Sequence, residues 1–292
     1  MLQDHIKEIK KLAKEAKINL KIIKSTEEAI GYACSDYFPE KNLCVIKIFE
    51  SNGIDEHEKR ILLLHEFGHC INGKNFAKIK EKEKIDWINK NARYFHSWII
   101  ANEALNLFFR IIDELMADRY TEKITGKTCA IDSEETKRDI IKTYGKLNTS
   151  QRKKLFKSNF PEMNFNIDSF RSTIGHYHQI VAAFLKHKEV RKDDYYKILI
   201  SAFPRKFFIT MKNICEIVES NKSWKEKINL ARPYLKEEIY QICKLVLRKK
   251  RVDVKDVENM IKNFYANVKD GDEKKMIMEM NISDFEKLMK NV

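Results

Sequence analysis

The order of apolar and polar residues predicts a mixed α and β region followed by helices alone. Residues 2–17 carry apolar side chains at helical spacing with charges between them, which is typical of an amphipathic helix. Residues 18–23 alternate apolar and polar side chains, and residues 43–49 are rich in β-branched residues, so both segments predict strands. A polar stretch lies between these two strands.

The next predicted helix has a clear start and a clear end. Asp55 with Glu58 three residues later fits a capping box, in which each side chain satisfies a free backbone N–H. The helix continues through RILLLHEFGHCI and is expected to stop at Asn72-Gly73, because glycine is common just after a helix. Two further helical segments are predicted at residues 77–91 and 93–125, the second being one long helix or a helix pair that ends at Gly126.

Only helical patterns occur after residue 133, so the composition changes from mixed to all-α between residues 130 and 150. We therefore expect an α+β fold with a small sheet in residues 1–130. Residues 131–292 are expected to form an all-α C-terminal domain of unknown role.

The sequence LLLHEFGHC places two histidines four residues apart on a predicted helix. Residues at i and i+4 share a helix face, so His65 and His69 present two imidazoles one turn apart, as two corners of a tetrahedral zinc site require. Glu66 is rotated by about 100° from His65. Its carboxylate can therefore lie beside the open coordination position and act as a general base.

Gly68 is unusual because glycine inside a helix costs roughly 1 kcal/mol relative to alanine. Close approach by a second helix or by substrate is the simplest compensation. The flanking residues are apolar, so the helix is expected to be buried. Buried imidazoles and a carboxylate need partners, and a metal ion would supply one.

A catalytic zinc site usually has a third protein ligand, and no third histidine is found downstream at a suitable spacing. The best candidate is Glu114, in IIDELMADRY. Asp118 shares its helix face and can accept the second ring N–H of a histidine ligand. Ala117 is small enough to let two helices approach closely. Glu103 is the competing ligand.

HEFGH after a helix-strand-strand pattern, together with E-x-x-A-D-x-Y at residues 114–120, resembles the minimal gluzincin metallopeptidases, and most of all the ImmA/IrrE-like group. The resemblance covers about residues 1–126 and implies a zincin-like sheet with an HExxH active-site helix. It also implies His65, His69 and Glu114 as ligands of one Zn²⁺ per chain, with Glu66 as the base. Met116 stands where the family often has an acidic residue.

Other chemistry is less well supported by the sequence. His176, His178 and Tyr120 are possible donors for the oxyanion of a peptidase reaction, although His176 and His178 do not share a helix face. Gly-rich phosphate loops, a G-x-S-x-G elbow, zinc-finger spacing and RNP signatures are all absent.

The net charge of +13 favours acidic partners, but lysines and glutamates are mixed along most of the chain. Nucleic acid therefore remains a possible partner on charge alone. The six cysteines form no CxxC pair and are expected to be reduced thiols of a cytoplasmic protein. No apolar run reaches membrane length, and residues 1–17 do not resemble a signal peptide, so no membrane contact is expected.

These features predict a zinc metalloendopeptidase that hydrolyses a protein or peptide substrate. Two alternatives stay open at this point. The first is a regulator in which a zincin scaffold is combined with a basic helical region that binds nucleic acid or a protein. The second is a structural zinc site with a fourth protein ligand, for which the adjacent Cys70 is badly oriented.

Overall fold

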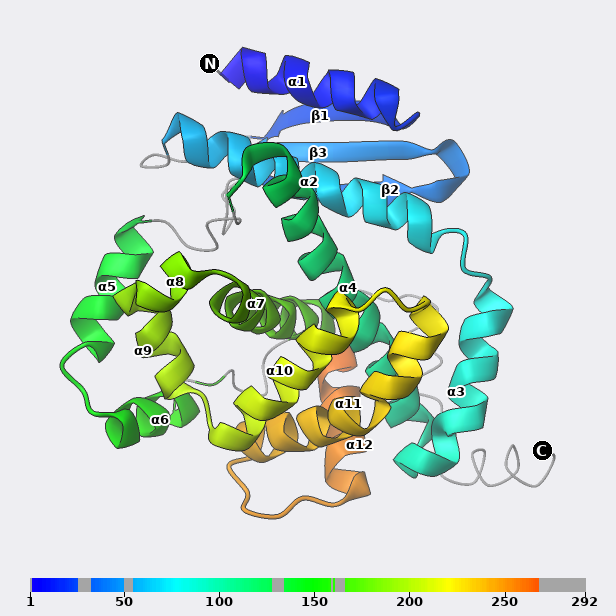
Figure 1. Cartoon of the computed structure of the whole chain (residues 1–292). Coiled ribbons are helices and arrows are strands. Elements are labelled where there is room, and N and C mark those ends of the chain that lie inside the picture. Colours follow the sequence, from blue (N-terminus) through cyan, green and yellow to red (C-terminus); the bar gives the residue numbers. More distant parts are fainter. Residues whose placement is uncertain are drawn as a thin grey trace. The chain divides into compact units, whose positions relative to one another are not determined.

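The computed structural model describes residues 2–25, 33–49, 55–127, 134–158, 160 and 166–267 (Figure 1). The fold is mixed α+β, with a small three-stranded sheet and many helices. The elements are α1 (Leu2–Glu15), β1 (Asn19–Ser25), β2 (Ala33–Phe38), η1 (Pro39–Lys41), β3 (Leu43–Phe49), α2 (Glu56–Phe76), α3 (Glu81–Phe95), α4 (Trp98–Thr125), α5 (Glu134–Tyr144), α6 (Thr149–Ser158), α7 (Ile167–Lys186), α8 (Lys188–Lys192), α9 (Asp194–Ala202), α10 (Arg205–Glu219), α11 (Trp224–Val246) and α12 (Val254–Ala266).

The chain divides into two compact units. The first, here called the sheet unit, comprises Met1–Lys80 and Ile112–Arg138; the second, the helical unit, comprises Glu81–Ile111 and Asp139–Val292. The sequence predicts a single boundary near residue 130, whereas residues 81–111 belong with the later helices. Helical periodicity shows that a face is buried but does not show which core receives it, so this assignment could not be made from the sequence.

The sheet has the strand order β1-β3-β2. β1 runs parallel to β3 and β2 antiparallel to it, with Leu20 opposite Cys44 and Ile22 opposite Ile46. Because side chains alternate along a strand, Cys44 and Ile46 share one face, and that face packs with Ile9 of α1 and Leu64 of α2 in one hydrophobic core. The sheet thus provides the platform for α2.

β2 is the strand that the sequence does not indicate. Its side chains alternate between half-buried and exposed positions, and the inward ones are Ala33, Ser35 and Tyr37. Because two of these inward residues are small and none is a large aliphatic side chain, the sequence of β2 does not show the alternation of apolar and polar residues that predicts a strand. The strand is defined instead by its pairing with β3 through the turn at η1 and by its packing on α2.

α2 begins as the sequence predicts but ends later. Asp55 and Glu58 form the expected capping box. The expected stop at Gly73 is wrong, because the helix continues to Phe76. A Cβ on Gly73 would lie 2.8 Å from the Cβ of Tyr37, so this glycine admits the side chain of a neighbouring strand and does not end the helix.

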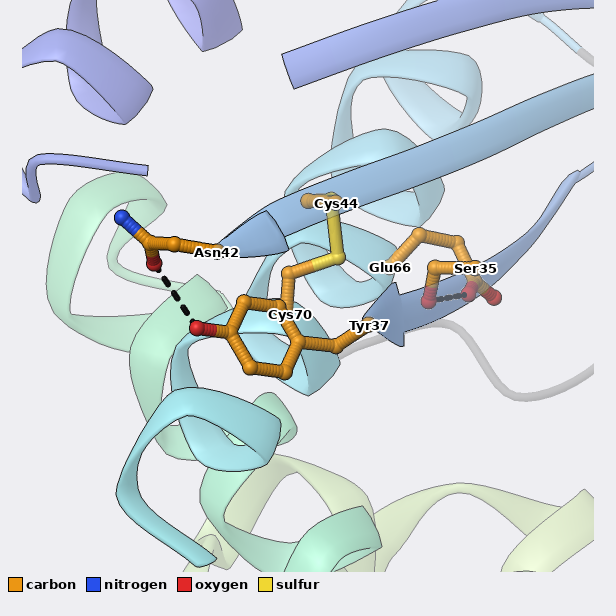
Figure 2. The surroundings of a disulfide bond; sticks show 6 residues. All are labelled: Ser35, Tyr37, Asn42, Cys44, Glu66 and Cys70. Carbon is orange, nitrogen blue, oxygen red and sulfur yellow. Dashed lines mark hydrogen bonds between the residues drawn. A yellow bond between two sulfur atoms is a disulfide. The ribbon is translucent and has the colours of Figure 1, made fainter. Parts of the chain in front are cut away.

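A disulfide joins Cys44 of β3 to Cys70 of α2, with both residues fully buried (Figure 2). The expectation that all six cysteines are reduced is therefore wrong for this pair. The sequence could not reveal the bond, because pairing depends on two Cα atoms that folding brings to 5.6 Å. Disulfides are typical of oxidising compartments, so the cysteines no longer support a cytoplasmic location.

The part of the helical unit that is described after residue 133 consists of helices and their connections, as the sequence predicts. None of the described helices combines the length and the apolar character needed to cross a membrane. Aromatic rings form much of the core, where Phe203 and Phe207 pack around Tyr177 of α7. Burial raises the pKa of Tyr177 far above its ordinary value, so its phenol stays protonated.

This core also encloses a histidine and a carboxyl group. His178 Nε2 lies 3.5 Å from Glu238 Oε1, and both side chains are fully buried. Burial lowers the pKa of His178 to about 4 and raises the pKa of Glu238 well above its ordinary value. Burial therefore favours the neutral form of each group.

We expect the disulfide to stabilise the sheet unit by about 3 kcal/mol, because it closes a loop with a sequence separation of 26 residues. Cys44→Ala and Cys70→Ala should each lower the unfolding free energy by roughly this amount, measured by urea denaturation. The matched control is Cys34→Ser, which changes an exposed cysteine outside the Cys44–Cys70 bond and should lower stability much less. Alkylation of Cys44 and Cys70 in unreduced, denatured protein would contradict the bond.

Glu238→Gln should stabilise the folded chain at neutral pH. The unfolded chain releases this carboxyl proton above a pKa of about 4.5, while the folded chain retains it, so wild-type stability falls as pH rises above that value. The variant should be more stable than the wild type at pH 7, and the gain should be smaller at pH 5. Calorimetry at both pH values measures the difference, and an equal gain at each would refute the explanation. The neighbouring Glu237→Gln is the control.

Candidate metal centre

Three side-chain atoms of the sheet unit converge between α2 and α4. His65 and His69 lie one turn apart on α2, and their Nε2 atoms are 3.0 Å from each other. Glu114 of α4 places Oε2 3.4 Å from Nε2 of His65 and 3.6 Å from Nε2 of His69. His65 and Glu114 are buried, with 7% and 6% of their surface exposed.

The separations of these atoms fit a tetrahedral metal ion. Zn–N and Zn–O bonds near 2.1 Å at tetrahedral angles place neighbouring ligand atoms about 3.3–3.5 Å apart. The three observed distances, 3.0, 3.4 and 3.6 Å, bracket that value. The sequence expectation that Glu114 lies with the two histidines is thus matched by the geometry.

The other ring nitrogen of each histidine faces an aspartate of α4. Nδ1 of His65 lies 2.9 Å from Oδ1 of Asp118, as the sequence predicts for that residue. Nδ1 of His69 lies 2.9 Å from Oδ2 of Asp113. A carboxylate at Nδ1 favours the tautomer with its proton there, which leaves the Nε2 lone pair for a metal.

Two carboxylates of α4 act on the pKa of His69. Burial lowers the pKa of His69, but the carboxylates of Glu114 and Asp113 outweigh it, so the pKa is raised above its ordinary value. Two imidazole nitrogens and a carboxylate oxygen within 3.6 Å of one another repel unless a proton or a metal cation lies among them. A bound cation would supply that positive charge.

Glu66 stands beside the two histidines. His65, Glu66 and His69 offer ligand atoms that all lie within 4.8 Å of one another, so this group could hold a metal ion. Glu66 Oε2 also accepts a hydrogen bond of 2.6 Å from the hydroxyl of Ser35 on β2 (Figure 2). The oxygen of Glu114 also approaches both Nε2 atoms within 3.6 Å, while Glu66 is held by Ser35, so Glu114 is the better placed candidate for the third ligand position.

Gly68 explains how α2 and α4 come close enough to share the site. A Cβ on Gly68 would lie 2.8 Å from Cα of Ala117 and 3.1 Å from its Cβ. Any larger side chain at Gly68 would push the helices apart. The close approach of a second helix, expected from the sequence, is therefore confirmed.

Two alternatives for the ligand set are removed by the structure. Glu103 belongs to the helical unit, where its carboxylate accepts hydrogen bonds of 3.0 and 2.6 Å from Arg171. It is therefore not available as the competing third ligand. Cys70 is bonded to Cys44, so it cannot be the fourth ligand of a structural zinc site.

The proposed oxyanion donors, His176, His178 and Tyr120, belong to different units of the fold. His178 is enclosed in the core of the helical unit beside Glu238, and His176 lies on the same helix, α7. Tyr120 packs its ring against Phe67, with ring centroids 5.7 Å apart. Tyr120 also packs against the hydrophobic core that α1 shares, and burial, with the carboxylates of Glu15 and Glu8, raises its pKa to about 12.

Sequence reasoning misses three residues of the site, which are Asp113, Asn72 and Ser35. Helix rotation predicts that Asp113 points about 100° away from Glu114, yet it faces His69 and also accepts a hydrogen bond of 2.9 Å from Asn72. A rotation of about 100° between Asp113 and Glu114 makes the two side chains point in different directions. Both can still contact α2, because each meets a different part of that helix. Ser35 is not predicted as a site residue, because the sequence of β2 lacks the alternation that would predict a strand there.

Comparisons with known proteins do not identify a family for this chain. No protein-family model, curated protein or solved structure matches this chain. The resemblance to the gluzincins consequently depends on the chain's own motifs, HEFGH and the segment from Glu114 to Tyr120, and on the geometry that unites them.

Proposed function

We propose that the chain is a zinc-dependent metalloendopeptidase of the gluzincin type, with His65, His69 and Glu114 as the metal ligands. The observation that carries this proposal is the convergence of two Nε2 atoms and one carboxylate oxygen within 3.6 Å. Two imidazoles with one carboxylate suit Zn²⁺ better than Mg²⁺ or Ca²⁺, which prefer oxygen ligands.

The residues around the site suit peptide hydrolysis. A zinc ion there would polarise a substrate carbonyl and acidify water at its open position. Glu66 accepts the proton of the attacking water and then delivers it to the amine that leaves. Ser35 holds the carboxylate of Glu66 in place, while Asp118 and Asp113 fix the orientation of the two imidazoles.

Elemental analysis of purified protein should find about one zinc per chain. Glu114→Gln should weaken zinc binding by at least about tenfold, because even residues that only support the ligands of a metal contribute that much to affinity. Glu103→Gln is the matched control, since it makes the same chemical change on the same helix within the other unit. Full zinc retention by Glu114→Gln, or loss by Glu103→Gln alone, would contradict the ligand assignment.

Glu66→Gln should lower kcat/KM for cleavage of an unfolded protein by at least about 100-fold, because the amide cannot accept the proton of water. Zinc content should remain at the wild-type value, which separates loss of the base from loss of the metal. Cleavage is monitored with fluorescently labelled casein, in the presence and absence of a chelator. Equal cleavage by the variant would exclude Glu66 as the base.

A further inference from the structure

A cleft of about 490 Å³ lies in the helical unit, between α3, α11 and the segment after α11. Its volume is in the range of about 300–1,000 Å³ that is usual for small-ligand sites. The residues that give it its chemistry are Tyr94, Lys236, Glu237, Tyr240, Lys244 and Arg251. All of them belong to the helical unit, so a ligand in this cleft would be held without any residue of the metal centre.

One wall of the cleft is held in place before any ligand arrives. Lys236 donates a hydrogen bond of 2.6 Å to the carbonyl of Tyr94 and stands 4.8 Å from the centre of that ring. The guanidinium of Arg232 lies 4.2 Å from the same ring centre. Tyr94 is thus clamped by two cations, and the wall loses little conformational freedom on binding.

Two further hydrogen bonds fix α3 to α11, the helices labelled at the right and centre of Figure 1. The indole of Trp87 donates to Asn229 at 3.0 Å, and Arg232 donates to Asn91 at 2.9 Å. These bonds connect residues far apart in the sequence. The cleft is therefore a preformed feature of the helical unit.

The lining has an excess of positive charge. Among the described residues, no hydrogen-bond or ion-pair partner meets the side-chain ammonium of Lys244 or the guanidinium of Arg251, although both residues line the cleft. The single carboxylate of the lining, Glu237, already accepts a hydrogen bond from Gln241. Nearby, Asp256 is paired with Lys249 at 2.6 Å. An anion in the cleft would therefore meet two cations that no protein carboxylate of the described chain neutralises.

Tyr240 adds an aromatic surface to this lining. Burial and, to a smaller extent, the carboxylate of Asp253 raise the pKa of Tyr240, so the phenol stays protonated and can donate a hydrogen bond. A flat ring beside unpaired cations suits a ligand that is flat at one end and anionic at the other. A base attached to a phosphate has that form, and such bases stack on tyrosine without regard to sequence.

We propose that this cleft binds a nucleotide unit. Its phosphate is held by Lys244 and Arg251, and its base stacks on Tyr240. The same unit occurs as a free nucleotide and within a single strand, and the two sources differ in an experiment. Guanidinium groups bind phosphate with paired hydrogen bonds, and an ammonium group adds a point charge.

The full-length chain is titrated with thymidine monophosphate, with a short fluorescent oligothymidylate, and with ribose 5-phosphate as a probe without a base. Lys244→Ala combined with Arg251→Ala should weaken nucleotide binding by at least about tenfold. The matched control removes one arginine and one lysine, Arg191 and Lys192, which are exposed on α8 of the same unit. Tyr240→Leu should weaken the thymidine probes and leave ribose 5-phosphate unchanged.

Stronger binding of the monophosphate would identify a free nucleotide as the ligand, and stronger binding of the oligomer would identify a single strand. Absence of binding by both thymidine probes would overturn the proposal. Equal loss in the pocket variant and in the control would also overturn it, because binding would then depend on net charge alone. Equal affinity for ribose 5-phosphate and the monophosphate would refute the role of Tyr240.

Discussion

The close contact of α2 and α4 at Gly68 and Ala117 is the constraint on which the sheet unit depends. Glycine at this position costs helix stability, but it lets the two backbones approach until a Cβ no longer fits. At that separation the imidazoles of one helix reach the carboxylates of the other. A wider spacing would leave each of these polar groups buried without a partner. The close packing of the two helices and the contacts between their polar side chains therefore require the same helix spacing.

The sheet supports this helix pair from the other side of α2. The disulfide fixes α2 to the central strand β3, and Ser35 and Tyr37 of β2 contact α2 at Glu66 and Gly73. α2 is thus restrained at several points along its length. Such rigid support suits the role of base that we propose for Glu66, because small displacements weaken a positioned base.

The part of this arrangement that the sequence predicts is the part that is local. The capping box at Asp55, the pairing of His65 with His69 on one face, and Gly68 as a point of close approach can all be deduced from helical spacing. Asp113, Ser35 and the partner of Cys70 depend on which segments folding brings together, and no local pattern encodes that. The grouping of residues 81–111 with the later helices is inaccessible for the same reason.

The division of the chain between the two units also affects the order in which they can fold during synthesis. α4 belongs to the helical unit up to Ile111 and to the sheet unit from Ile112, so one continuous helix serves both cores. During synthesis the candidate metal centre can form once residue 138 has emerged, while the apolar side chains of Trp87 and Phe95 still lack the later helices that bury them. Cutting the gene near residue 130 would leave those faces exposed permanently. A fragment meant to isolate the metal centre would need residues 81–111 replaced by a short linker that rejoins α2 to the second half of α4.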